Sequence, residues 1–209
     1  MEQKEALRVQ LDTASVQTPI PMSSLATYAD WTALRYRPVA ATGEYDARRQ
    51  MLVDNRVHEG RAGYHVVTPL VLDDGRTVLV NRGWAPQGAS RGSPPVAVPP
   101  AGTVTVIGRI ATPVGGFFEL ASASPTGNVW QNLDPARFSA ATGIKVLPML
   151  IEATRSPAPD DGLVRDWPAP DFGVEKHRVY MVQWYAFAAV AIVMWAVVHL
   201  RHRVLRADD

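Results

Sequence analysis

Residues 64–84 read YHVVTPLVLDDGRTVLVNRGW. Two runs of apolar and β-branched residues, 64–72 and 77–84, are joined by an Asp-Asp-Gly turn at 73–75. Such residues favour strands, and a short Asp-Gly connection between two such runs favours a hairpin. The stretch therefore predicts a pair of antiparallel strands at the centre of the fold.

Further strands are predicted on both sides of this hairpin, at 31–43, 49–57, 103–110, 128–132 and 146–153. Pro148 has no backbone N–H to donate, which predicts that strand 146–153 lies at an edge of the sheet. One short helix is predicted after Asp134, a favoured N-cap, and it ends at Gly143. Many adjacent strands with few helices predict a mainly β domain, an antiparallel barrel or a sandwich-like fold.

Composition and motifs exclude several function classes. The 209 residues carry 21 Lys and Arg against 20 Asp and Glu, so no basic excess is present to bind nucleic acid. The absence of Cys excludes disulfides, thiolate zinc sites, iron–sulfur clusters and cysteine nucleophiles. No Walker loop, H-E-x-x-H or G-x-S-x-G motif occurs. The paired carboxylates at 73–74 and 160–161 are interpreted as solvated turn residues.

An uncharged run, VYMVQWYAFAAVAIVMWAVVHL, occupies residues 179–200. As a helix it is about 33 Å long, which matches the hydrocarbon core of a bilayer. It predicts a transmembrane helix over 177–202, and a buried core helix is the alternative. Arg201, Arg203 and Arg206 follow the run, whereas Lys176 and Arg178 precede it. This excess of three over two favours a cytoplasmic C-terminus and a β domain on the other side of the membrane.

The predicted organisation has five parts: an N-terminal helix and linker at 1–30, a β-rich extracytoplasmic domain at 31–154, a Pro-rich linker at 155–176, the membrane helix at 177–202 and a charged cytoplasmic tail at 203–209. The first 17 residues contain no apolar segment of the kind found in signal peptides. We therefore expect an N-terminal transmembrane helix to be missing from this chain. A tail-anchored protein with a cytoplasmic β domain is the alternative.

His177 is the histidine best placed to bind a cofactor. Tyr180 and Trp184 follow it at i+3 and i+7, so the three residues share one face of the predicted helix. An imidazole beside aromatic rings at a membrane boundary suits a haem iron, whereas a polar cap to the helix is the alternative. His199 lies 22 residues further on, about 33 Å away along a helix, so one helix cannot offer both to one iron. A two-histidine site would need another chain or another helix, and a homo-oligomer is therefore one possibility.

Several segments together resemble the surfeit locus protein 1 family. They are GEYD at 43–46, GYHVVTPL at 63–70, VLVNRGWAP at 78–86, IEA at 151–153 and HRVYMVQWYA at 177–186. The resemblance covers residues 18 to 199. It implies an assembly factor for cytochrome c oxidase with two membrane helices. Such a factor assists insertion of haem a into the catalytic subunit and interacts with the haem a synthesis machinery. By motif, the haem-linked histidine of the family corresponds to His177.

The resemblance implies a location in the bacterial inner membrane with the β domain in the periplasm, or the equivalent place in the mitochondrial inner membrane. Arg82 then has two interpretations: it binds a haem propionate, or it forms an internal salt bridge that fixes a loop. The alternative function is a non-haem protein that docks on an oxidase subunit through its β domain. An enzyme would require His58 or His65 to lie beside carboxylates.

Overall fold

The structure is a computed structural model that describes residues 17–28, 30–88, 95–112, 127–157, 161–167 and 174–205. The chain divides into two compact units, Met1–Trp167 and Pro168–Asp209, and each is described by itself. The N-terminal helix predicted within residues 1–30 falls on residues 2–12, which lie outside the described residues.

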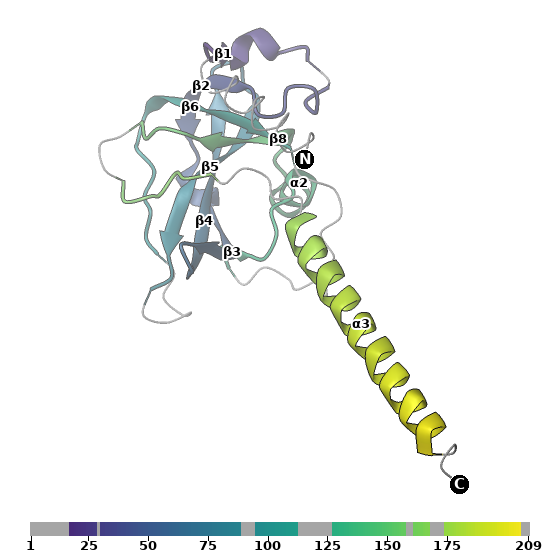
Figure 1. The fold of residues 1–209 in the computed structure, drawn as a ribbon. Helices are drawn as coiled ribbons and strands as arrows, with labels where there is room; N and C mark the ends of the chain where they lie inside the picture. The colour runs from purple at the N-terminus through teal and green to yellow at the C-terminus, as the bar shows by residue number, and fades with distance from the viewer. Residues whose placement is uncertain are drawn as a thin grey trace. The chain divides into compact units, whose positions relative to one another are not determined.

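The first unit consists mainly of β-strands (Figure 1). Its elements in chain order are β1 Ile20–Pro21, η1 Met22–Leu25, β2 Pro38–Tyr45, η2 Ala47–Arg49, β3 Met51–His58, β4 Arg61–Leu72, β5 Thr77–Pro86, β6 Thr103–Ala111, β7 Val129–Trp130, α2 Pro135–Thr142 and β8 Val146–Ala153.

Five of these strands close into a barrel. The pairings run β2–β6, β6–β8, β8–β5, β5–β4 and back from β4 to β2, and only β5–β8 is parallel. A closed ring of five strands is the arrangement of small Greek-key barrels. Strands β3 and β7 extend the sheet beyond β4, and β1 extends it beyond β2. The mainly β prediction is confirmed, and of its two alternatives the barrel is the observed one.

The interior of the barrel is filled by alternate residues of every strand. The largest buried cluster takes side chains from all five barrel strands, among them Val39, Leu70, Val80, Val106 and Ile151. The intervening residues on β5 and β8 are buried as well, because a second cluster packs them under α2 through Leu79, Leu150 and Phe138. Burial on both faces explains why the sequence of these strands is almost continuously apolar.

Strand β8 differs from its predicted position. It lies inside the ring, paired with β5 on one side and β6 on the other, so the prediction of an edge strand from Pro148 is wrong. The β5–β8 register shifts between the pairs Thr77–Val146 and Leu79–Leu150, so Pro148 falls at an irregularity where no ladder bond is needed. Pairing with β6 begins only at Leu150.

The central hairpin and the short helix agree with prediction. Strands β4 and β5 pair along their length, and the turn between them is closed by the amide of Leu72 donating to the carbonyl of Arg76 at 2.8 Å. Helix α2 begins after Asp134, whose carboxylate accepts a hydrogen bond from the amide of Ala136 at 2.8 Å. It ends at Gly143, which has a left-handed φ of 73°.

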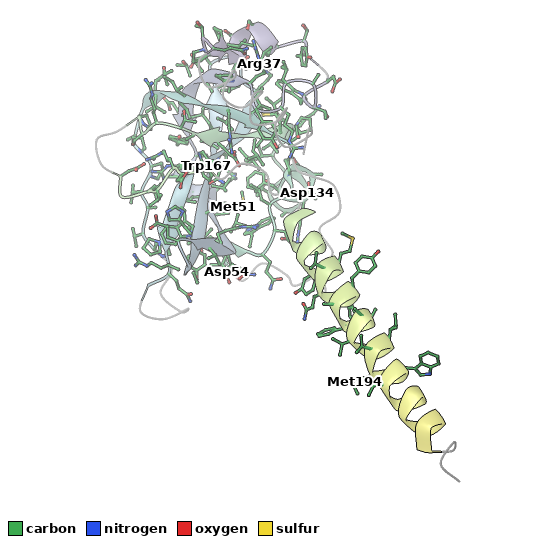
Figure 2. The ribbon with its side chains drawn as sticks, viewed as in Figure 1. Arg37, Met51, Asp54, Asp134, Trp167 and Met194 are labelled. Atoms are coloured by element: carbon green, nitrogen blue, oxygen red, sulfur yellow. The ribbon has the colours of Figure 1, made fainter. Side chains whose placement is uncertain are left out.

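The second unit contains the 32-residue helix α3, Val174–Leu205. Its side chains are described at residues 180–195 and 197, and the large apolar ones among them are 48% to 71% exposed. Figure 2 shows side chains, including that of Met194, projecting from several sides of this helix. Among the described residues, no helix is long and apolar enough to cross a membrane. The helix predicted at 177–202 is present within α3. That it spans a membrane stays a prediction.

The closure of the barrel depends on Gly43. Here β2 meets β4 over only three residue pairs, Gly43–Leu72 to Tyr45–Leu70, while β2 also keeps its full ladder with β6. A Cβ atom on Gly43 would lie 2.1 Å from the carbonyl oxygen of Val71 and 2.9 Å from the Cα of Leu72. The two backbones approach this closely only because residue 43 has no side chain.

We predict that Gly43→Ala lowers the free energy of unfolding by about 3 kcal/mol or more, because neither backbone at the crossing can yield without breaking the ring. Urea unfolding of the full chain measures the loss. The matched control is Glu44→Ala at the exposed neighbouring position, with a loss of less than about 1 kcal/mol. Equal stabilities of the two variants would contradict this account of barrel closure.

Candidate functional site

Arg82 lies at a bulge in β5. On β4, Val66 pairs with Gly83 and Val67 pairs with Asn81, so Arg82 is the extra residue that has no partner in the ladder. A bulge redirects a side chain relative to the regular alternation of a strand. The side chain of Arg82 points into the protein, and the residue is 1% exposed.

The guanidinium of Arg82 donates to three acceptors from two separate parts of the chain. Nη1 lies 3.0 Å from Oε1 of Gln50 and 2.8 Å from the carbonyl oxygen of Ala97, and Nη2 lies 3.2 Å from the carbonyl oxygen of Val98. Gln50 Oε1 also accepts from the hydroxyl of Thr68 at 3.0 Å. Burial of a charge is costly unless its donors are satisfied, and here the acceptors fix the extended segment 95–100 to the barrel.

A second segment, residues 161–167, packs against the same end of β5. The backbones of Trp84 and Val164 exchange two hydrogen bonds of 2.7 and 2.9 Å. Gly83, at φ 151°, permits this approach, since a Cβ there would lie 2.7 Å from the Cβ of Leu163. Residue 83 therefore has to lack a side chain for this segment to lie so close to β5.

The approach of this segment places Asp161 beside Arg82. Their Nη2 and Oδ2 atoms lie 3.7 Å apart, and Asp161 also forms an ion pair with Arg165. The side chain of Asp161 is 10% exposed, so its interpretation as a solvated turn residue is wrong. Burial alone would raise the pKa of Asp161, but hydrogen bonds from Arg165 and the amide of Leu163 hold it below its usual value.

Tyr45, from the end of β2, completes this group. The Cζ atom of Arg82 lies 5.5 Å from the centre of the Tyr45 ring. The hydroxyl of Tyr45 is buried and has no hydrogen-bond partner among the described residues. Burial raises the pKa of Tyr45 to about 12, against the opposing effects of Arg82 and Arg165, so the phenol stays neutral at physiological pH.

On the opposite face of β5, Asn81 lies beside His65. The Nδ2 atom of Asn81 is 3.2 Å from Nδ1 of His65, whose ring meets that of Trp167 edge to face at 5.3 Å. Burial, aided by the nearby charge of Arg56, lowers the pKa of His65 to about 4. His58 packs against Trp84 instead, with 5.2 Å between ring centres. Within the described part of the chain, no group of three or more metal-ligating side chains forms.

The four residues that the sequence singled out lie in both units. Arg82 belongs to the barrel unit and has internal partners there, as its loop-fixing interpretation requires. His177, Tyr180 and Trp184 belong to α3, where Tyr180 is 61% exposed and Trp184 is 71% exposed. Trp184 also meets Phe187 edge to face at 6.1 Å. A role of these α3 residues toward haem iron, and of Arg82 toward a haem propionate, stays a prediction.

Sequence reasoning missed most partners of Arg82. Gln50, Asp161 and Arg165 lie in short turns or a Pro-rich segment, where no periodic pattern indicates burial. Tyr45 could have been singled out from the sequence, because it lies in the GEYD segment at 43–46 that carries part of the family resemblance. What the arrangement achieves chemically is positioning: one buried cation holds two long connections on the barrel.

Comparison with known proteins gives a consistent result. Residues 1–189 match the model of the SURF1 family. A SURF1-like protein of Monosiga brevicollis is 29% identical over 205 residues, which cover 93% of this chain and 77% of that protein. Cytochrome oxidase assembly protein SHY1 of Saccharomyces cerevisiae is 29% identical over 74% of this chain and 44% of its own length. Surfeit locus protein 1 of Mus musculus is 26% identical over 92% and 66%.

We predict that Arg82→Lys lowers the free energy of unfolding by about 2–4 kcal/mol, because an ammonium group cannot reach three acceptors that a planar guanidinium fork satisfies. Urea unfolding measures the loss, and limited proteolysis reports release of segments 95–100 and 161–167. The control is Arg61→Lys at an exposed position on β4, where stability should hardly change. An unaltered proteolysis pattern in Arg82→Lys would contradict the anchoring role.

The low pKa of His65 predicts acid sensitivity. The unfolded chain binds a proton near pH 6.5 and the folded protein only near pH 4, so the stabilising contribution is complete above pH 6.5 and is lost as the pH falls toward 4. The loss is on the order of 3 kcal/mol. Unfolding free energies at pH 7, 5.5 and 4.5 measure it, and His65→Gln should flatten the slope over this range. The same slope in both proteins would exclude His65 as its source.

Proposed function

Because the chain belongs to the SURF1 family, we propose that it acts as an assembly factor for cytochrome c oxidase. The match of residues 1–189 to the family is the observation that carries the proposal. The yeast relative SHY1 is by its name a cytochrome oxidase assembly protein. The chain spans 77% of the Monosiga relative but 39% to 44% of the mycobacterial and yeast relatives, so the activity of the whole protein is part of the proposal.

In this role the protein assists delivery of haem a to the catalytic subunit of the oxidase. The candidate ligand is His177, with Tyr180 and Trp184 on the same helical face. The chemistry of these residues fits a haem. Imidazole is a common ligand of haem iron. Tyr180 is 61% exposed and Trp184 is 71% exposed, so an apolar macrocycle can lie on their side chains. When bound, the haem supplies the iron. In such a complex His177 would hold the iron through an imidazole nitrogen, and Tyr180 and Trp184 would supply an aromatic face.

The uncharged residues 179–200 anchor the protein in the membrane. A helix that is apolar all round needs a buried or lipid environment. The exposure of Tyr185, Val190 and Trp195 in α3 supports lipid as that environment. The location that follows is the bacterial inner membrane with the barrel in the periplasm, or the mitochondrial inner membrane with the barrel on the corresponding side, and the C-terminus in the cytoplasm or matrix.

The barrel unit serves as a docking module for the oxidase and for the haem a synthesis machinery, without catalysing a covalent step. His65, which an enzyme would need beside carboxylates, instead has Asn81, Trp167 and the charge of Arg56 around it. This environment keeps the imidazole of His65 neutral and largely shielded from solvent. Docking through the barrel without haem is the second candidate function, and the experiment below separates the two.

The test is the visible spectrum of the full chain, purified in detergent from cells that make haem a. We expect a Soret band in the wild type and its loss in His177→Ala. The matched control is His199→Ala, which removes the histidine at the other end of the same uncharged run and should retain the band. Unfolding temperatures of all three proteins verify that loss of haem is not loss of fold.

Three outcomes decide between the hypotheses. Loss of the band only in His177→Ala supports haem delivery. No band in the wild type, together with co-purification of oxidase subunits, favours the docking protein without haem. A wild type that neither carries haem nor restores oxidase assembly to a strain lacking the gene would overturn the assembly role itself.

A further inference from the structure

A second cluster of charged side chains in the barrel unit takes no part in the Arg82 network. It comprises Arg35 and Tyr36, just before β2, Arg109 on β6 and Glu152 on β8. The Cζ atoms of Arg35 and Arg109 lie 4.8 and 5.5 Å from the centre of the Tyr36 ring. Arg109 Nε is 2.7 Å from Glu152 Oε2. Two guanidinium groups therefore lie over one aromatic ring, and the carboxylate of Glu152 pairs with the guanidinium of Arg109.

The backbone of Tyr36 is strained. Its φ is 67°, in the left-handed region that bulky residues rarely adopt. Hydrogen bonds hold it there: the amide of Tyr36 donates to the carbonyl of Ile110 at 2.8 Å, and the amide of Ile110 donates to the carbonyl of Arg37 at 3.0 Å. Strain of this kind gathers at functional positions, so an outlier fixed from both sides is a reason to ask what the side chain does.

Two donors in this cluster have no acceptor. The hydroxyl of Tyr36 and Nε of Arg35 are both buried and lack a hydrogen-bond partner among the described residues. Tyr36 as a whole is 8% exposed. Nearly all buried donors in folded proteins are satisfied by protein or by ordered water, and an unsatisfied one calls for an explanation. The unsatisfied pair thus marks a place where acceptor oxygens are missing.

The charges of the cluster indicate what those oxygens belong to. Arg35 and Arg109 contribute two positive charges and Glu152 one negative charge, which leaves an excess of one positive charge. Burial raises the pKa of Tyr36, so its phenol is a neutral donor. A group with one negative charge and at least two oxygens would balance the excess and accept from both unsatisfied donors.

We propose that Arg35, Tyr36 and Arg109 form a binding site for a singly charged oxyanion, a carboxylate or a phosphodiester group. The planar guanidinium groups match the paired oxygens of such an anion, and the Tyr36 hydroxyl donates a further bond. In the Arg82 cluster the hydroxyl of Tyr45 and Nε of Arg165 are likewise buried without a partner among the described residues, but Arg82 itself already donates to three acceptors of the chain. The site is separate from the haem face on α3 and does not depend on the proposed function.

The test is the unfolding temperature of the full chain in detergent, with dimethyl phosphate or acetate compared with chloride at equal ionic strength. A ligand that binds only the folded state raises this temperature. We expect the oxyanions to raise that of the wild type above its value in chloride. Arg35→Gln should lose most of this rise, and Arg61→Gln, which removes an exposed charge elsewhere on the barrel unit, should keep it.

Tyr36→Phe is the sharper variant. It removes a hydroxyl that has no partner, so without oxyanion the variant should be as stable as the wild type or more stable. With oxyanion it should show a reduced rise. A hydroxyl with a purely structural role would give the opposite pattern, with lower stability in chloride and an unchanged response to the oxyanions.

A further arm identifies the source of the anion. If dimethyl phosphate or acetate raises the unfolding temperature in detergent, the anion of the site is a soluble ligand or a carboxylate of a partner protein. A rise seen only in nanodiscs of phosphatidylglycerol, and lost in Arg35→Gln, assigns a lipid headgroup. If the wild type shows no rise in any arm, or if Arg35→Gln and Tyr36→Phe respond as the wild type does, the proposal is wrong.

Discussion

The buried charge of Arg82 is the constraint around which the barrel unit is organised. A guanidinium removed from water must satisfy its donors inside the protein, and three of its acceptors come from connections rather than from strands. Because Ala97 and Val98 belong to one connection and Asp161 to another, a single side chain fixes both. The bulge directs the Arg82 side chain inward, and Gly83 leaves room for the second connection. The short Asn-Arg-Gly sequence therefore supplies the anchoring charge, its inward direction and the space for the segment that it anchors.

The sequence was sufficient to predict what depends on local pattern. The central hairpin, helix α2 with its cap at Asp134, and a mainly β fold all follow from turn residues and alternation. What it did not reveal depends on contacts between distant residues. The interior place of β8 was missed because Pro148 was judged alone, whereas a register irregularity removes the need for its N–H. Asp161 was taken for a turn residue because its partner Arg82 lies 79 positions earlier.

The barrel unit uses the same set of groups twice. Each cluster contains two arginines, one carboxylate and a tyrosine whose buried hydroxyl has no partner in the part of the chain that the structure describes. In the first, Arg82 donates to three acceptors of the chain and so fixes two connections, although Nε of Arg165 has no partner among the described residues. In the second, the guanidinium of Arg35 faces Tyr36 with its Nε unsatisfied. The same set of groups thus fixes two connections around Arg82 and, in our proposal, binds an oxyanion around Arg35.

The order of strands in the ring has a consequence for synthesis. The hairpin of β4 and β5 is local and can form early, but the ring stays open until β8, at Val146–Ala153, pairs between β5 and β6. Contacts between such distant segments form slowly, since the intervening chain must first lose its freedom. We therefore expect a nascent chain to expose the inner faces of β2, β4 and β5 until β8 has been made. Completion of the barrel then comes just before α3 emerges.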